Sequence, residues 1–104
     1  MTFEKYKKDG NVAVLVSPGY GAGWSTWGTD QAALAMDRDL VGALLEGGNS
    51  KLAEVALQKY PGEYQGGLGD VEIEWVPEGS RFEIREYDGN ESLVVFGPDH
   101  GMLA

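Results

Sequence analysis

Residues 12–16 form a continuous apolar run, Val12-Ala13-Val14-Leu15-Val16, that is rich in β-branched side chains. A strand with one face in water alternates apolar and polar residues, whereas this run is apolar at every position. It therefore predicts a β-strand that is covered on both faces. The strand is expected to end at Ser17-Pro18-Gly19, because Pro18 has no N–H group with which to continue a ladder.

Two helices are expected in the middle of the chain. Residues 40–45 place leucine and valine on one helical face, with Asp37 or Asp39 as the candidate N-cap and Gly47-Gly48 as the end. A second helix fits residues 51–60. We interpret the two aspartates as capping groups rather than as a catalytic pair.

Three strands are predicted in the last third of the chain, at residues 71–75, 81–87 and 91–96, where apolar and polar side chains alternate. A four-residue turn and then a three-residue turn would connect them as an antiparallel meander. These turn lengths predict a register that pairs Ile84 with Val94 and Phe82 with Phe96, and they place Glu72 opposite Arg85.

This register brings the large apolar side chains to one face of the meander. They are Ile73, Trp75, Phe82, Ile84, Val94 and Phe96. The other face mixes apolar and charged side chains, which indicates partial cover by the N-terminal loop, by another subunit or by a ligand.

The elements together predict a small α+β fold in a single domain, residues 1–104. It comprises an N-terminal strand, a glycine- and aromatic-rich loop, two helices and a C-terminal three-stranded antiparallel meander, which the N-terminal strand is expected to join. The alanines of residues 29–36 favour one further helical turn, capped by Thr29 or Asp30.

Composition excludes several classes of protein. The 104 residues include 8 basic and 17 acidic side chains, which give a net charge of −9 and argue against binding a nucleic-acid duplex. No cysteine is present, so neither a disulfide nor a thiolate site is expected. No apolar run approaches the ~20 residues of a membrane span, and the N-terminus lacks the apolar region of a signal peptide.

The segment from Ser17 to Gly28 is the candidate ligand-binding loop. It places four glycines and three large aromatic residues within 12 positions. Glycine allows backbone N–H groups to approach an anion closely, and aromatic rings can stack on a base. The expected binding residues of the loop are Ser17, Gly19, Tyr20, Gly21, Ala22, Gly23, Trp24, Ser25, Thr26 and Trp27. The spacing matches neither the dinucleotide fingerprint nor the P-loop, and the alternative is a tight structural loop whose aromatic side chains fill the core.

Arg81 and Arg85 are the other candidate ligand-binding residues, because they lie four positions apart and on the same face of one predicted strand. The alternative is that they neutralise neighbouring glutamates. We expect neither a metal site nor a cofactor, because His100 is the single histidine. No catalytic residue is predicted, since Ser17 and Ser25 have no base other than His100.

Two blocks of the chain resemble a family of small proteins, of uncharacterised function, that bacteriophages and prophages encode. One block runs from Val14 to Trp27 and includes Val-Ser-Pro-Gly-Tyr-Gly-Ala-Gly-Trp-Ser-Thr-Trp. The second block runs from Asp70 to Ile84 and is followed by the similar stretch Glu86 to Ser92. The resemblance implies a phage accessory role, such as countering a host defence, rather than a particular activity.

Two functional hypotheses follow. The first is a non-catalytic protein that holds a nucleotide-type or phosphate-containing molecule and so sequesters a defence signal. The alternative is an acidic inhibitor of a host nucleic-acid enzyme or defence complex, bound through its carboxylates. A homodimer is plausible because exposed strand edges need cover. The reducing cytoplasm is the expected compartment, that of the host if the protein is phage-encoded.

Overall fold

The computed structural model describes residues 3–19, 23–63, 66–96 and 101–104, which form two helices and two three-stranded antiparallel sheets. The helices are α1 (Gln31–Met36) and α2 (Arg38–Lys59), with short 3-10 turns at Ser25–Trp27 and Leu68–Asp70. The strands are β1 (Lys7–Lys8), β2 (Asn11–Val16), β3 (Glu72–Pro77), β4 (Arg81–Tyr87), β5 (Asn90–Phe96) and β6 (Met102–Leu103). The predicted α+β class is confirmed, with its N-terminal strand, central helices and three C-terminal strands.

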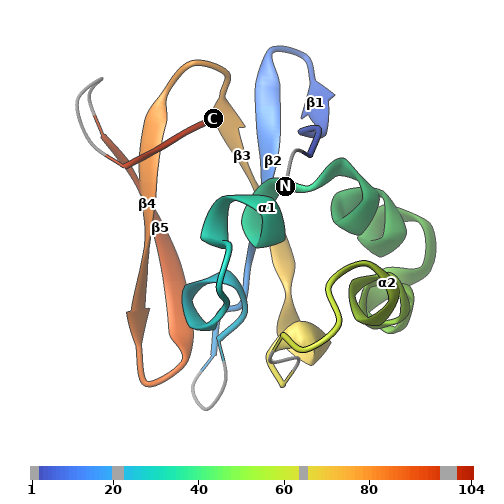
Figure 1. The fold of residues 1–104 in the computed structure, drawn as a ribbon. Helices are drawn as coiled ribbons and strands as arrows, with labels where there is room; N and C mark the ends of the chain where they lie inside the picture. Colours follow the sequence, from blue (N-terminus) through green and yellow to red (C-terminus); the bar gives the residue numbers. More distant parts are fainter. Residues whose placement is uncertain (1–2, 20–22, 64–65, 97–100) are drawn as a thin grey trace.

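Strand β2 lies at the centre of the molecule, between α2 on one side and the sheet of β4 and β5 on the other (Figure 1). Ala13 and Leu15 pack with the buried side chains of α2, and Val12, Val14 and Val16 pack against those of β4. All five are essentially inaccessible to solvent. The prediction of a strand covered on both faces is confirmed.

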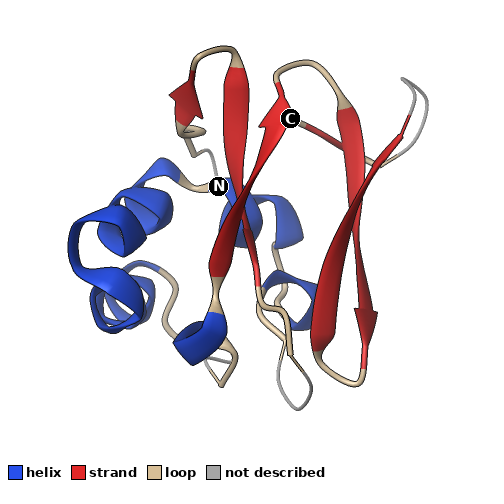
Figure 2. Cartoon of the chain, turned by 180° about the vertical axis from the view of Figure 1, so that it is seen from behind, coloured by secondary structure: helices blue, strands red, loops and turns tan. Residues whose placement is uncertain are grey.

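Strand pairing differs from the predicted meander. Strand β3 pairs with β2, in the order β1-β2-β3, whereas β4 lies in the second sheet, in the order β5-β4-β6 (Figure 2). The prediction that β3 pairs with β4 is therefore wrong. The turn between β3 and β4 forms hydrogen bonds to other parts of the chain. Glu78 N–H donates to the carbonyl of Gly10, and Gly79 N–H donates to the carbonyl of Ala104.

The predicted register between β4 and β5 is wrong by one position. Ile84 pairs with Leu93 and Phe82 with Val95. The turn has two residues rather than three, because Asp88 and Gly89 both adopt positive φ, 53° and 86°. This is the left-handed backbone that a two-residue hairpin turn with the strand twist requires.

Helix α2 contains both predicted helices. Asp37 is its N-cap and accepts a hydrogen bond from the N–H of Asp39, as one of the two predicted alternatives. Gly48 breaks the helical conformation with φ 73° and ψ −164°, which confirms the predicted interruption and folds the chain into two arms, residues 38–47 and 49–59. The further helical turn predicted over 29–36 is α1, which Asp30 caps.

No described helix has both the length and the apolar character that crossing a lipid bilayer requires.

Candidate functional site

The described part of the glycine-rich loop wraps around a carboxylate of the same chain. Glu91, on β5, is 2% exposed, and one of its oxygens accepts a hydrogen bond from Ser17 N–H at 2.9 Å. The other oxygen accepts from Trp24 N–H at 2.8 Å, from Thr26 N–H at 3.1 Å and from the Thr26 hydroxyl at 2.5 Å. The loop thus binds an anion as its composition predicts, but the anion is an internal glutamate.

Gly23 shows why a glycine is needed beside this carboxylate. A Cβ atom at Gly23 would lie 3.0 Å from Thr26 Oγ1, 3.1 Å from Trp27 Cδ1 and 3.2 Å from Glu91 Oε2. Such contacts are tighter than ordinary van der Waals distances, so a side chain would disturb the bonds around Glu91. We call Glu91 and the donors of Ser17, Trp24 and Thr26 the Glu91 cage.

The aromatic residues of the loop have different surroundings. Trp24 is fully buried, and its indole N–H donates to the carbonyl of Leu34 at 2.8 Å. It therefore fills the core, as the structural alternative for the loop expected, and offers no surface for stacking. Trp27 is 40% exposed. The predicted binding residues Tyr20, Gly21 and Ala22 lie outside the described residues.

The Ser17 hydroxyl and the Gly19 N–H form hydrogen bonds to other residues of the chain. Ser17 Oγ donates to the carbonyl of Gly67 at 3.0 Å, and Gly19 N–H donates to the side chain of Asn90 at 2.9 Å. Ser25 is buried, and its hydroxyl has no hydrogen-bond partner among the described residues.

Of the two predicted arginines, Arg85 shares a depression with a residue of the loop, and Arg81 forms a hydrogen bond elsewhere. Arg85 lines a shallow depression of about 530 Å³ together with Thr26, whereas Arg81 donates to the carbonyl of Gly101 at 3.3 Å. The predicted pairing of Glu72 with Arg85 is wrong, because Arg85 pairs with Ser92 across β4 and β5. Glu72 pairs instead with Val16.

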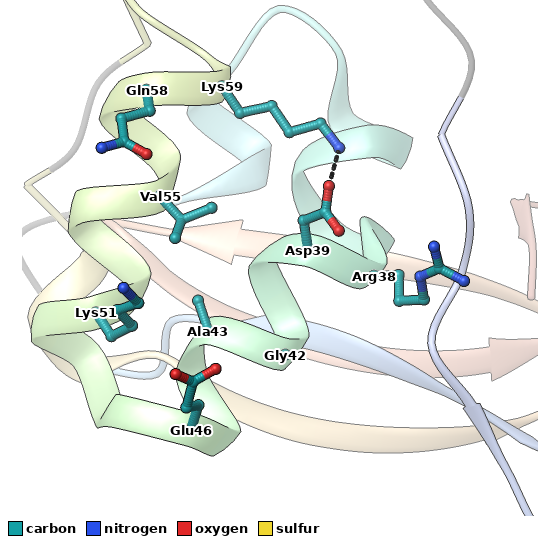
Figure 3. Close-up of a pocket in the computed structure, with 9 residues that line it drawn as sticks. All are labelled: Arg38, Asp39, Gly42, Ala43, Glu46, Lys51, Val55, Gln58 and Lys59. Carbon is teal, nitrogen blue, oxygen red and sulfur yellow. Dashed lines mark hydrogen bonds and ion pairs between the residues drawn. The ribbon is translucent and has the colours of Figure 1, made fainter.

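A larger groove lies between the two arms of α2, a region in which the sequence predicted no binding site. It has a volume of about 610 Å³, within the range of small-molecule sites. Figure 3 shows Arg38, Asp39, Gly42, Ala43 and Glu46 on the first arm and Lys51, Val55, Gln58 and Lys59 on the second, with the Arg38 side chain extending away from the second arm. Small or apolar side chains thus alternate with charged groups from both arms.

The groove contains three of the eight basic residues of a strongly acidic chain. Arg38, Lys51 and Lys59 line it, against Asp39 and Glu46, so the lining has a formal charge of +1. The pairs that Arg38 forms with Glu4 and Lys51 with Glu54 are more than a third exposed, and such pairs contribute little to stability.

A buried carboxylate beside the groove holds Lys59 in place. Asp37, 1% exposed, accepts a hydrogen bond from the Tyr60 hydroxyl and forms an ion pair with Lys59 Nζ at 2.8 Å. Lys59 also bonds Asp39 at 2.7 Å, across the two arms (Figure 3). Burial and then the bond to Asp37 raise the pKa of Tyr60 well above its usual range, so the phenol stays protonated.

The same contacts fix the charge of the lysine. Burial alone would lower the pKa of Lys59, but its hydrogen bonds to Asp37 and Asp39 together raise it. The bond to Lys59 in turn lowers the pKa of Asp39. Lys59 is therefore a positioned cation at neutral pH, tied to both arms of α2.

Two signals in the sequence could have identified this groove. Gly42 lies inside a predicted helix, where glycine is about 1 kcal/mol less favourable than alanine, and a glycine there is typical of a position at which space matters. The stretch from position 38 to position 59 also carries as many basic as acidic residues, three of each, in a chain with a net charge of −9.

No family model matches the chain, and neither a curated protein nor a solved structure shows significant similarity to it.

Among the residues that the structure describes, no three carboxylate or histidine side chains are grouped in a way that could hold a metal ion.

Proposed function

We propose that the protein binds a small nucleotide-type or other phosphate-containing molecule in the groove of α2, without converting it chemically. The single observation that supports this most is the groove itself, which combines small and apolar lining residues with three cations. Ligand sites typically have an apolar lining with a few convergent polar groups. A base or another flat apolar body would lie against Gly42, Ala43 and Val55, and an anionic group would meet the cations.

The electrostatics of the groove are less unfavourable to an anion than the charge of the whole chain implies. Even when buried Asp37 is included, the groove is formally neutral, whereas the chain carries −9. Charges more than ~8–10 Å away are largely screened at physiological salt, so the local cations dominate the interaction with an anionic group. Lys59 is held in place by two carboxylates, which reduces the entropy lost when a ligand is bound.

Binding without chemistry is proposed because the titratable groups beside the groove form hydrogen bonds and ion pairs with one another. Asp37 is shared by Tyr60, Lys59 and the N–H of Asp39, so its carboxylate is engaged on both oxygens. In a phage-encoded protein, such a binder would sequester a signalling nucleotide of the host.

Gly42 offers a direct test of this proposal. A Cβ added there meets no atom within 4 Å, so Gly42→Leu would fill the groove without disturbing the core. Gly69 also has open space at its Cβ and lies outside the groove, so Gly69→Leu is the matched control.

The measurement is thermal unfolding with inorganic phosphate, mononucleotides, cyclic dinucleotides and ADP-ribose derivatives. A ligand at 100 times its Kd stabilises the fold by about 2.7 kcal/mol, which corresponds to a rise of roughly 10–20 °C in Tm for a domain of this size. We expect at least one compound to stabilise the wild type and Gly69→Leu but not Gly42→Leu. Absence of any shift, or an equal shift in all three proteins, would contradict the proposal.

A further inference from the structure

Strand β3 presents an open edge. It pairs with β2 along one side, and in the described structure no strand pairs with its other side. Figure 2 shows β3 at the front of the molecule, with no described element drawn across it. Its six residues are mostly exposed, apart from buried Val76 and half-buried Ile73.

The pairing pattern fixes which backbone groups point outward. Ala13 N–H donates to the carbonyl of Tyr6, on the β1 side of β2. In an antiparallel ladder the N–H and C=O of one residue point to the same side and alternate along the strand. The residues opposite Ala13 and Leu15, which are Trp75 and Ile73, therefore direct both backbone groups toward the open edge.

Pro77 agrees with this pattern. It pairs with Asn11 and so has the same parity as Ile73 and Trp75. An N–H group at this position would point toward the open edge, and proline, which has no N–H, is tolerated at such a position. The open edge thus offers two complete N–H and C=O pairs, which is enough for a short added strand.

The side chains beside these groups are acidic. Glu72 and Glu74 are exposed, and neither forms an ion pair with any described residue. They lie two positions apart on one face of β3, a separation of roughly 7 Å that matches alternate residues of a neighbouring strand. On the opposite face, Trp75 is 42% exposed, with its ring 6.2 Å from that of Tyr6.

We propose that the open edge of β3 binds an extended basic segment of another protein, which adds to the sheet as a fourth strand. Charge complementarity selects this occupant. Lysine or arginine at alternate positions would face Glu72 and Glu74, and an apolar residue between them would lie on the face of Ile73 and Trp75. This surface lies outside the α2 groove, so the inference does not depend on the ligand proposed there.

The same features could serve only to protect the edge, since charged side chains and proline discourage pairing between copies. A binding experiment separates the two roles. The probe is a capped heptapeptide that alternates arginine and valine, with arginine at both ends. Two control peptides carry glutamate in place of arginine, or proline in place of the central valine, which removes a backbone donor.

The matched protein variants are Glu72→Gln/Glu74→Gln at the edge and Glu54→Gln/Glu83→Gln at exposed positions away from it, which give the same net charge. We expect the edge variant to bind the arginine peptide about tenfold more weakly and the control variant to bind it within about twofold of the wild type. Bound peptide should also slow hydrogen exchange at the amides of Ile73 and Trp75, and both control peptides should fail to do so.

Equal weakening in the two variants would show attraction to net charge alone and would overturn the inference. Binding that leaves the amide exchange of Ile73 and Trp75 unchanged would place the peptide elsewhere and would overturn it as well. No binding of the arginine peptide would leave the charges with a protective role only.

Discussion

Replacing Glu91 by alanine removes the acceptor of four hydrogen bonds from the glycine-rich loop. Hydrogen bonds to charged groups contribute roughly 1.5–3 kcal/mol each, but their sum overstates the loss because the loop can relax and admit water. Removing one partner of a buried charged interaction typically costs about 3–5 kcal/mol. We expect Glu91→Ala to lower the free energy of unfolding by about 4 kcal/mol, out of a total of roughly 5–15 kcal/mol for a small domain.

Glu91→Gln is predicted to have a smaller effect. Its amide oxygen can take the position that accepts from Trp24 and Thr26, but its NH₂ group then faces the N–H of Ser17. One unsatisfied buried donor costs about 1–3 kcal/mol.

Urea unfolding, followed by tryptophan fluorescence, measures both effects. Glu86→Gln is the control, because Glu86 pairs with Glu91 across β4 and β5 but is exposed. The expected order of destabilisation is Glu91→Ala, then Glu91→Gln, then Glu86→Gln, with the last within about 0.5 kcal/mol of the wild type. If Glu91→Ala changed the unfolding free energy by less than about 1 kcal/mol, the Glu91 cage would not hold the loop in place.

Three further predictions concern α2 and the core. In Lys59→Met, the pKa of Asp39, measured by carbon NMR, should rise toward its ordinary value of 3.8, because the bond that lowers it is lost. In the wild type, the Lys59–Asp39 pair should lose its contribution to stability as the pH falls below 3.8 and through the lower pKa that Asp39 has in the folded state. Lys59→Met should show no such loss from Asp39. Gly48→Ala should lower the free energy of unfolding, measured in urea, by roughly 1–3 kcal/mol, because φ is +73° at this position. Gly42→Ala, inside the helical first arm, should be neutral or raise it by up to ~1 kcal/mol. Similar effects at both positions would contradict a break of the helix at Gly48. Trp24→Phe should cost about 2–4 kcal/mol, through a lost buried hydrogen bond and a smaller ring, and a cost below about 1 kcal/mol would show that its indole N–H is not bonded in the core.

Much of the fold could be predicted from local sequence patterns. The uniform apolar run of β2 implied cover on both faces, Asp37 was one of two candidate caps, and Gly48 was expected to interrupt the helix. Strand partners were not predictable in the same way. The alternation of β3 and β4 fits a hairpin, but β2 needs a partner on each side, and that requirement acts over about 60 residues of sequence separation.

The site was harder to predict for a related reason. Glycines that expose backbone N–H groups do indicate an anion, but nothing local reveals that Glu91, 65 residues from Thr26, is that anion. The groove of α2 exists only because the break at Gly48 folds one arm against the other. Gly42 and the basic residues of this stretch indicate that it differs from the rest of the chain, but only the fold brings Arg38 and Lys59 to one cavity.

Proton–nitrogen NMR during titration with the compound that most raises Tm tests the proposed site most directly. The predicted result is saturable chemical-shift change at Gly42, Ala43 and Val55, with little change at Gly23 and the amides of the Glu91 cage. Shifts confined to Gly23 and the cage would contradict the proposed site and return the ligand to the glycine-rich loop.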